Sequence, residues 1–388
     1  MNKKLIALAI AGAFVAPVAM ADASNVTITG QMHFSLDSLN GKNAAGTDLT
    51  RKANISSNAS NIIFKGTEDL GNGMNAYFNI QTYFSAGGTG NSDTTFGAAG
   101  DGVGQGNTYV GLSGKSWGAV QLGKMESPFK ILSRKVDLFN NQIGDTRNFT
   151  ARASTNTVPA TGGTPGWDTR PNNTIAYMTP NFNGFVGTLA YFTNASTGAA
   201  IDASATANAN AVSGYAGSAT YENGPIFAGA GYERHNLSKY QTGIGLNDEH
   251  AWRVSGGYNF GTFKLTALYH REGGVYQSAT NTDASRNVYG LGGAFNMGSN
   301  TLKAQYYHTG NVSGTSDTGA NLWALGVDHA MSKRTSVYAA YARTDNKNSA
   351  AYSAFGGGHG DNPGTTTPSA TVGAKDPSGF SVGVIHNF

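Results

Sequence analysis

The chain contains 388 residues, and its 26 Lys and Arg outnumber its 23 Asp and Glu, for a formal net charge of +3. This near-neutral balance argues against a nucleic-acid-binding protein, and the absence of cysteine excludes disulfides and cysteine-ligated metals. Only 13% of the residues are charged, against roughly 25% in typical soluble domains, while 54 Gly, 19 Phe and 18 Tyr are present. Much of the surface is therefore not expected to face water in the usual way.

The N-terminus has the layout of a secretory signal peptide. Lys3 and Lys4 precede an uncharged run from Leu5 to Val18, which ends in Ala19-Met20-Ala21, an A-x-A cleavage site. The alternative, a transmembrane helix, needs about 20 apolar residues, and this run is shorter. We therefore expect that residues 1–21 are cleaved and that residues 22–388 form a single mature domain.

After the N-terminal segment, the dominant period of the hydrophobic pattern is two residues. In the first such segment Val26, Ile28, Met32, Phe34 and Leu36 alternate with Thr27, Thr29, Gln31, His33 and Ser35. This alternation predicts a strand with one apolar and one wet face, although a soluble sandwich would show it too. The pattern recurs in residues 74–81, 263–269, 302–307 and 380–385, in segments of roughly the 9 to 11 residues that a tilted strand needs to cross a bilayer.

Short turns alternate with long polar connections along the chain. We predict seven short turns, such as Asp69–Gly73 and Asn259–Gly261, and eight long connections rich in Gly, Ser, Thr and Asn. Together they join about sixteen strands, and short turns on one side with long loops on the other are typical of outer-membrane barrels. The sequence therefore predicts an all-β fold, a transmembrane antiparallel β-barrel with both termini on the periplasmic side. Aromatic residues near the short turns suit a girdle at the inner interface: Trp117, Phe182, Phe185, Tyr258, Phe260 and Phe263.

Several segments, taken in order along the chain, carry a specific resemblance. Residues 64–73, with the sequence FKGTEDLGNG, look like a second strand and first turn, and residues 107–114 and 118–123 are similar to a fourth and fifth strand. Residues 172–177, 256–261, 332–336 and 383–388 match in the same order. The chain resembles the general porins of Gram-negative bacteria, in the branch typical of betaproteobacteria, over its whole mature length. The resemblance implies a homotrimer of sixteen-stranded barrels, each with a water-filled pore narrowed by its third long loop folding inward.

The third long loop would be residues 127–170, in which Leu138 stands where many family members have proline. The net charge of this loop is +3, because it contains three acidic residues, Asp137, Asp145 and Asp168, and six basic ones: Lys130, Arg134, Lys135, Arg147, Arg152 and Arg170. Charged side chains act strongly on ions in a narrow, low-dielectric passage, and basic residues favour anions. We therefore expect a pore constriction formed by Lys130, Arg134, Lys135, Asp137, Asp145, Arg147 and Arg152. The alternative is that these loop charges pack against the wall or a subunit interface.

Further basic residues occupy positions of predicted strands that alternate with apolar residues and so belong to the polar face. Lys65, Lys264 and Lys303 would add positive charge to the lumen. The eight histidines are scattered, and neither a metal cluster nor a converging acid–base or nucleophile set is visible. We therefore expect no cofactor, no metal and no enzymatic activity.

The resulting functional hypothesis is passive diffusion of small hydrophilic solutes and inorganic ions, with a weak anion preference. A substrate-specific channel is the main alternative, and an adhesin or structural barrel is less favoured. Phe388 closes a last segment that resembles the assembly signal of outer-membrane barrels. The expected partners are therefore the barrel assembly machinery, outer-membrane lipid and lipopolysaccharide, and two further copies of the chain.

Overall fold

The computed structural model describes residues 26–42, 54–83, 103–151, 166–194, 213–236, 248–274, 284–355 and 375–388. Nearly all of them lie in one antiparallel sheet. Its strands are β1 (Thr27–Lys42), β2 (Asn54–Ser57), β3 (Asn61–Gly71), β4 (Met74–Tyr83), β5 (Thr108–Gly114), β6 (Gly118–Lys124), β7 (Asn172–Met178), β8 (Phe185–Asn194), β9 (Ser213–Asn223), β10 (Ile226–Asn236), β11 (Glu249–Asn259), β12 (Phe263–Gly273), β13 (Arg286–Met297), β14 (Asn300–Thr309), β15 (Ala320–Ala330), β16 (Thr335–Asn346) and β17 (Lys375–Asn387). Two short helices, α2 (Pro128–Arg134) and α3 (Arg147–Thr150), lie between β6 and β7.

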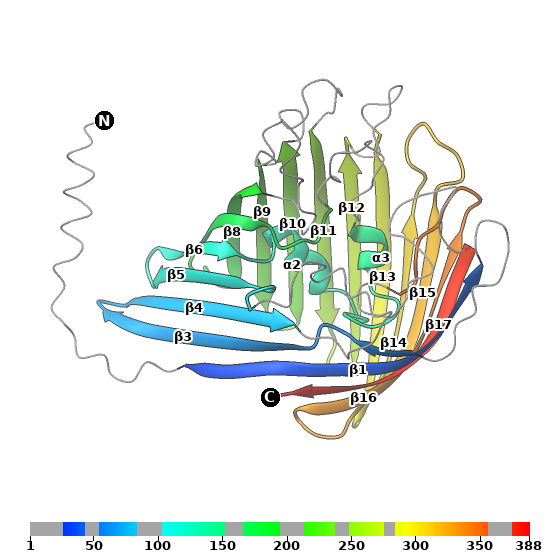
Figure 1. Ribbon diagram of the computed structural model, residues 1–388, viewed down its shortest axis with the longest axis horizontal. Helices are drawn as coiled ribbons and strands as arrows, with labels where there is room; N and C mark the ends of the chain where they lie inside the picture. Colours follow the sequence, from blue (N-terminus) through cyan, green and yellow to red (C-terminus); the bar gives the residue numbers. More distant parts are fainter. Residues whose placement is uncertain are drawn as a thin grey trace.

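The sheet closes on itself into a barrel (Figure 1). Each strand from β3 to β16 pairs with the next one along the chain, and β17 pairs with β1. Because β2 and β3 both pair with β1 and only residues 58–60 separate them, they are two halves of one span. The 17 strand segments therefore make sixteen spans, which confirms the predicted fold. Phe388 completes the seam through two backbone hydrogen bonds with Gly30, of 3.0 and 3.1 Å.

The outer face of the barrel is apolar and the inner face is polar. On β1, Ile28 and Leu36 are 57% and 54% exposed, whereas His33 and Asp37 are each 1% exposed. The same alternation recurs on β17, where Val382 is exposed and Ser381 is buried. A water-soluble fold would bury these aliphatic side chains, so their exposure indicates a wall that contacts lipid.

Aromatic side chains mark two levels of this outer wall. Near the short turns the exposed ones are Phe182, Phe185, Tyr258, Phe260 and Phe263, and near the long connections they are Tyr191, Tyr215, Trp252, Tyr289 and Trp323. Two such rings are the aromatic girdles of outer-membrane barrels. Val26 and Phe388 both lie at the short-turn end. No helix in the described ranges is long and apolar enough to cross a membrane.

Candidate functional site

The described parts of the connection between β6 and β7, residues 125–151 and 166–171 and here called the inner loop, fold into the barrel (Figure 1). Its first turn forms α2 because the Ser127 hydroxyl accepts a hydrogen bond from the Phe129 amide at 3.2 Å and Pro128 starts the helix. Leu132 of α2 packs against Gly229 of β10, where an added Cβ would lie 2.6 Å from the leucine side chain. Glycine at that position therefore lets the helix approach the wall closely.

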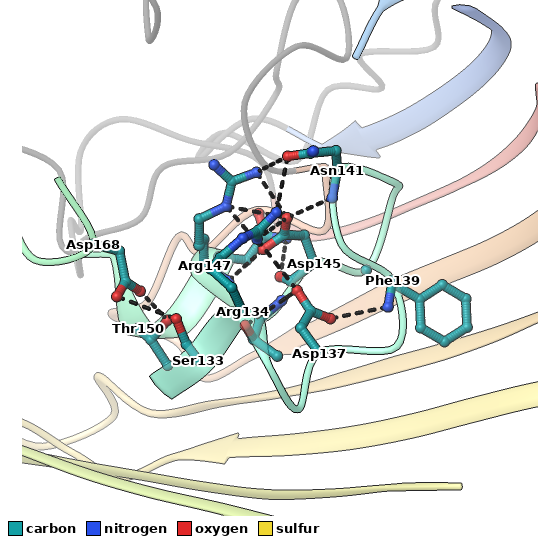
Figure 2. Close-up of polar contacts among 12 residues, drawn as sticks. Ser133, Arg134, Asp137, Phe139, Asn141, Asp145, Arg147, Thr150 and Asp168 are labelled. Atoms are coloured by element: carbon teal, nitrogen blue, oxygen red, sulfur yellow. Dashed lines mark hydrogen bonds and ion pairs between the residues drawn. The ribbon is translucent and has the colours of Figure 1, made fainter. Parts of the chain in front are cut away.

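A buried ion pair ties the inner loop to β11. Arg253 pairs with Asp168, and neither side chain is exposed. Ser133 and Thr150 donate hydrogen bonds to the same carboxylate, at 3.2 and 2.7 Å, so that Asp168 joins α2, α3 and the returning chain (Figure 2). Loss of one partner from a buried pair leaves an uncompensated charge and costs about 3–5 kcal/mol. The pair therefore holds the loop against this side of the barrel.

Strands β13 and β14 hold the far side of the inner loop. Arg286 donates a hydrogen bond to the Phe149 carbonyl at 2.8 Å, and the Gln305 amide donates to the Gly144 carbonyl at 2.7 Å. The Gln305 side-chain oxygen accepts a hydrogen bond from the Leu138 amide at 3.1 Å. A proline at position 138 has no amide proton and could not make this bond. The leucine here therefore adds an anchor between the loop and the wall.

Two arginines of the inner loop converge on one carboxylate (Figure 2). Arg134 Nη1 and Arg147 Nη2 donate to the same oxygen of Asp145 at 3.0 and 2.8 Å. Both guanidinium groups also donate to the side-chain oxygen of Asn141, at 3.0 and 2.9 Å. Asp137 lies nearby, with a carboxylate oxygen 3.6 Å from Arg134. The cluster fixes two cations side by side with little freedom to move.

These cations border a polar cavity of about 210 Å³ between the inner loop and the wall at β3 and β4. It is lined by Ala59, Asn61, Gln81, Tyr83, Glu126, Lys130, Arg134, Asn140, Asn141, Arg147 and Arg170. Glu126 is the one carboxylate in this lining, against four cations. It accepts from Lys130 at 3.1 Å and from Arg170 at 2.7 Å. The described lining therefore carries an excess of positive charge.

The surroundings of the loop shift the pKa of its charged groups. Burial would raise the pKa of Glu126, but Lys130 and Arg170 outweigh it and hold that pKa at about 2. Burial, with Arg170 nearby, lowers the pKa of Lys130 to about 7. Burial and the neighbouring Asp145 raise the pKa of Asp137 to about 7, whereas Arg147 and Arg134 overcome burial and hold the pKa of Asp145 well below its usual range. Lys130 and Asp137 therefore change charge near neutral pH.

The predicted constriction residues occupy different positions in the loop. Lys130, Arg134 and Arg147 line the cavity, whereas Asp137 and Asp145 lie behind them as partners of the arginines. Lys135 faces away from the cavity, and its Nζ lies 2.8 Å from Glu222 near a short turn. Arg152 lies outside the described residues.

The three lysines predicted to face the lumen also differ in their surroundings. Lys65 on β3 is exposed and pairs across the ladder with Thr27, on the polar face. Lys264 is half-buried and alternates with exposed Phe263 on β12. Lys303 is 7% exposed, and its Nζ contacts Asp328 at 2.8 Å and Gln142 at 2.7 Å. Lys303 therefore holds the inner loop.

Several residues of this site were not among the predicted constriction residues. Glu126 precedes Lys130 by one helical turn, a spacing that could have indicated the ion pair. Gln81 and Tyr83 lie on the polar parity of β4, yet that parity does not reveal which polar positions meet the loop. Arg253 is an arginine on the inward parity of a strand, the kind of position that needs a buried partner.

Comparisons with known proteins agree with this architecture. A family model described as Gram-negative porin matches residues 7–349. Over 358 residues the chain is 31% identical to outer membrane porin protein 32 of Delftia acidovorans, covering 89% of this chain and 90% of that protein. It is 27% identical to an outer membrane porin protein of Bordetella pertussis, covering 87% and 93% of the two chains.

Solved structures match the barrel along its length. The anion-selective porin from Comamonas acidovorans matches with a TM-score of 0.71 at 26% identity, over 94% of this chain and all of that chain. The trimer form of OmpT from Vibrio cholerae matches with a TM-score of 0.58 at 14% identity, over 95% of this chain, which supports the fold alone.

A closed barrel with a lipid-facing wall, a polar interior and a charged loop folded inside defines a channel of the outer membrane. The chain belongs to the Gram-negative porin family, as the sequence resemblance indicated. It is an outer-membrane porin, a channel and not an enzyme.

Proposed function

We propose that this porin has a modest preference for anions among the small hydrophilic solutes that diffuse through it. The observation that carries the proposal is the cavity beside the inner loop, whose lining includes Lys130, Arg134, Arg147 and Arg170 against Glu126. Fixed cations in a narrow passage attract anions and repel cations before either ion is dehydrated. Two of the four cations share Asp145 and two share Glu126, so the net field is moderate.

The similar anion-selective porin from Comamonas acidovorans supports this proposal. A substrate-specific channel is the second candidate, because the amide groups of Asn61, Gln81 and Asn141 line the same cavity as the cations. Such groups hydrogen-bond one particular anion better than others. A specific channel would show current block that saturates at low concentration of one solute, whereas a general channel would not.

The test is a neutralisation experiment on the purified protein in planar bilayers. In a salt gradient at about pH 6, Lys130→Gln with Arg134→Gln should move the zero-current potential toward cation preference. Lys347→Gln is the control for removal of a cation away from the cavity, because Lys347 is an exposed cation beside the last long connection. Equal shifts from both proteins, or none from the double variant, would reject the cavity as the selective passage.

The proposal extends to maturation and assembly. We expect cleavage after Ala21 and a homotrimer inserted by the barrel assembly machinery; residues 1–21 lie outside the described residues. Mass measurement of the mature N-terminus tests the cleavage site. The trimer form of OmpT supports the expected oligomer only through its shared fold.

A further inference from the structure

The described part of the last long connection, residues 347–355, folds back against the inner face of the barrel. Its residues 350–355 have the sequence AAYSAF, a mostly apolar run in a connection otherwise rich in Gly, Ser and Thr. All six are buried, and Tyr352 and Phe355 have no exposed surface. Asn346, the last residue of β16, fixes the turn, because its side chain accepts a hydrogen bond from the Tyr352 amide and donates one to the Tyr352 carbonyl, both at 2.9 Å. Residues 350–355 are here called the inserted segment.

The inserted segment completes an apolar core between the inner loop and the wall. Tyr352 and Phe355 belong to one buried cluster with four side chains of the inner loop: Val136, Phe139, Ile143 and Phe149. On the wall side, Phe355 reaches β17, where a Cβ added to Gly379 would lie 3.0 Å from its ring. Protein cores packed from such side chains have few voids large enough for water. The described interior beside β13 to β16 is therefore filled, whereas the polar cavity lies beside β3 and β4.

Tyr352 of the inserted segment holds helix α3. Its ring meets the ring of Phe149 nearly edge-on, with centroids 5.1 Å apart and an interplanar angle of 64°. The Arg286 guanidinium of β13 bridges the same two residues, because it donates to the Tyr352 hydroxyl at 2.7 Å and to the Phe149 carbonyl at 2.8 Å. The position of α3 therefore depends on a side chain from the last long connection as well as on the wall.

A second contact holds the inner loop before α3. The Gly144 amide donates a hydrogen bond to the Ala354 carbonyl at 2.7 Å. Gly144 has a φ of +84°, and a Cβ added there would collide with Ala324 of β15, so the loop backbone lies close between the inserted segment and the wall. Arg147, whose side chain lines the cavity, lies between Gly144 and Phe149 in the sequence. The two contacts therefore hold the chain on both sides of this arginine.

We propose that the inserted segment is a positioning element of the pore, in which Tyr352 and Ala354 keep Arg147 at the border of the cavity. The ion selectivity of the channel then depends on a connection that reaches the pore from the long-loop end of the barrel. The physical reason is that the force of a charge on a passing ion falls steeply with distance in salt water. The selectivity part of this inference rests on the anion preference proposed above, whereas the steadiness of the open-channel current does not.

The experiment uses the purified full-length porin in planar bilayers. Tyr352→Ala removes the ring that meets Phe149, and Tyr352→Phe keeps that ring and removes only the hydroxyl. Val312→Ala is the matched control, because Val312 is a buried apolar residue of another long connection, bonded within it to Thr315 and Thr318. Each variant is recorded for zero-current potential in a salt gradient and for open-channel noise, and the heat-modification temperature identifies folded protein.

A charge that moves from about 6 to about 12 Å from the passing ion loses most of its screened interaction, so Tyr352→Ala should lower the anion-to-cation permeability ratio about two-fold. Its open-channel current should also be noisier. Tyr352→Phe and Val312→Ala should behave like the unmodified protein. In an Arg147→Gln background, Tyr352→Ala should change the ratio no further, because the charge that it displaces is already absent.

Unmodified selectivity and noise in folded Tyr352→Ala, or the same changes in Val312→Ala, would overturn the proposal. A shift in the ratio that persists in the Arg147→Gln background would show that Tyr352 acts on another group, and would also overturn it. If Arg147→Gln alone leaves the ratio unchanged, the proposed anion preference fails, and the noise of Tyr352→Ala then decides the positioning role. Should Tyr352→Ala fail to assemble, Phe149→Leu removes the same ring contact from the other side and carries the same expectations.

Discussion

Replacing Lys130 with glutamine tests whether the cavity sets the ion selectivity, because it removes one defined charge from the cavity lining. The change removes a cation from the lining while Glu126 keeps its second partner, Arg170, at 2.7 Å. Lys135→Gln is the matched control, because Lys135 belongs to the same inner loop but contacts Glu222 away from the cavity. Both substitutions remove one positive charge from the loop, and only the first removes it from the lining.

The expected size of the effect follows from the distance between the ion and the charge. An ion that passes about 6 Å from the Lys130 ammonium interacts with it by about 0.7 kcal/mol in bulk water. Physiological salt, with a screening length of about 8 Å, roughly halves this value. Because the charge attracts an anion and repels a cation, the two effects add to about 0.7 kcal/mol. The anion-to-cation permeability ratio should therefore fall about three-fold, and further where the passage excludes water.

The effect should also depend on pH. Because the pKa of Lys130 is lowered to about 7, its ammonium is charged at about pH 6 and mostly neutral at about pH 8.5. Zero-current potentials in a salt gradient should therefore separate Lys130→Gln from the unmodified protein at the lower pH and not at the higher one. An equal change with Lys135→Gln, or a difference that persists at high pH, would refute the reasoning.

Four further outcomes are expected. In the unmodified protein the anion preference should fall as pH rises through about 7, since Lys130 loses its proton and Asp137, whose pKa is raised to about 7, becomes negative; a flat selectivity profile would contradict this. Asp168→Ala leaves Arg253 buried without its partner and should destabilise the loop by about 3–5 kcal/mol, seen as noisier single-channel current and a lower heat-modification temperature, whereas normal values would exclude the anchor. Deletion of Phe388 removes the last hydrogen bonds of the closing seam, so little assembled protein should reach the outer membrane, and a normal yield would exclude that role. Unheated gel samples should run as oligomers with or without reductant, because the chain has no cysteine, and a monomer alone even after mild crosslinking would contradict the trimer.

The barrel was predictable because its signals are local. Alternating parity in segments such as residues 26–36 places apolar side chains on one face regardless of what the other strands do. Short turns and long connections alternate in the sequence as they do in the structure. The strand bounds at the first long connection were less predictable: residues 37–42 and 54–57 read as polar connection but belong to β1 and β2, and residues 58–60, where Ala59 has a φ of +63°, separate β2 from β3.

The direction of loop side chains was not predictable in this way. Lys130 and Lys135 are close in sequence and chemically identical, yet one lines the cavity and the other contacts Glu222. Lys303 has the polar parity expected of a lumen residue, but Gln142 and Asp328 bind its ammonium. A loop without a repeating pattern has no parity to follow, so its contacts depend on partners far along the chain.

The sequence alone determined the barrel, its number of strands, its two faces and the excess of basic residues in the inner loop, because each of these depends on composition, on a period of two residues or on the alternation of short turns with long connections. The tertiary structure decided which of those charges border the cavity and which hold the loop. Arg253 and Asp168 lie 85 positions apart, and Gln305 and Asp137 lie 168 apart. Only closure of the barrel brings such groups, far apart along the chain, within hydrogen-bonding distance.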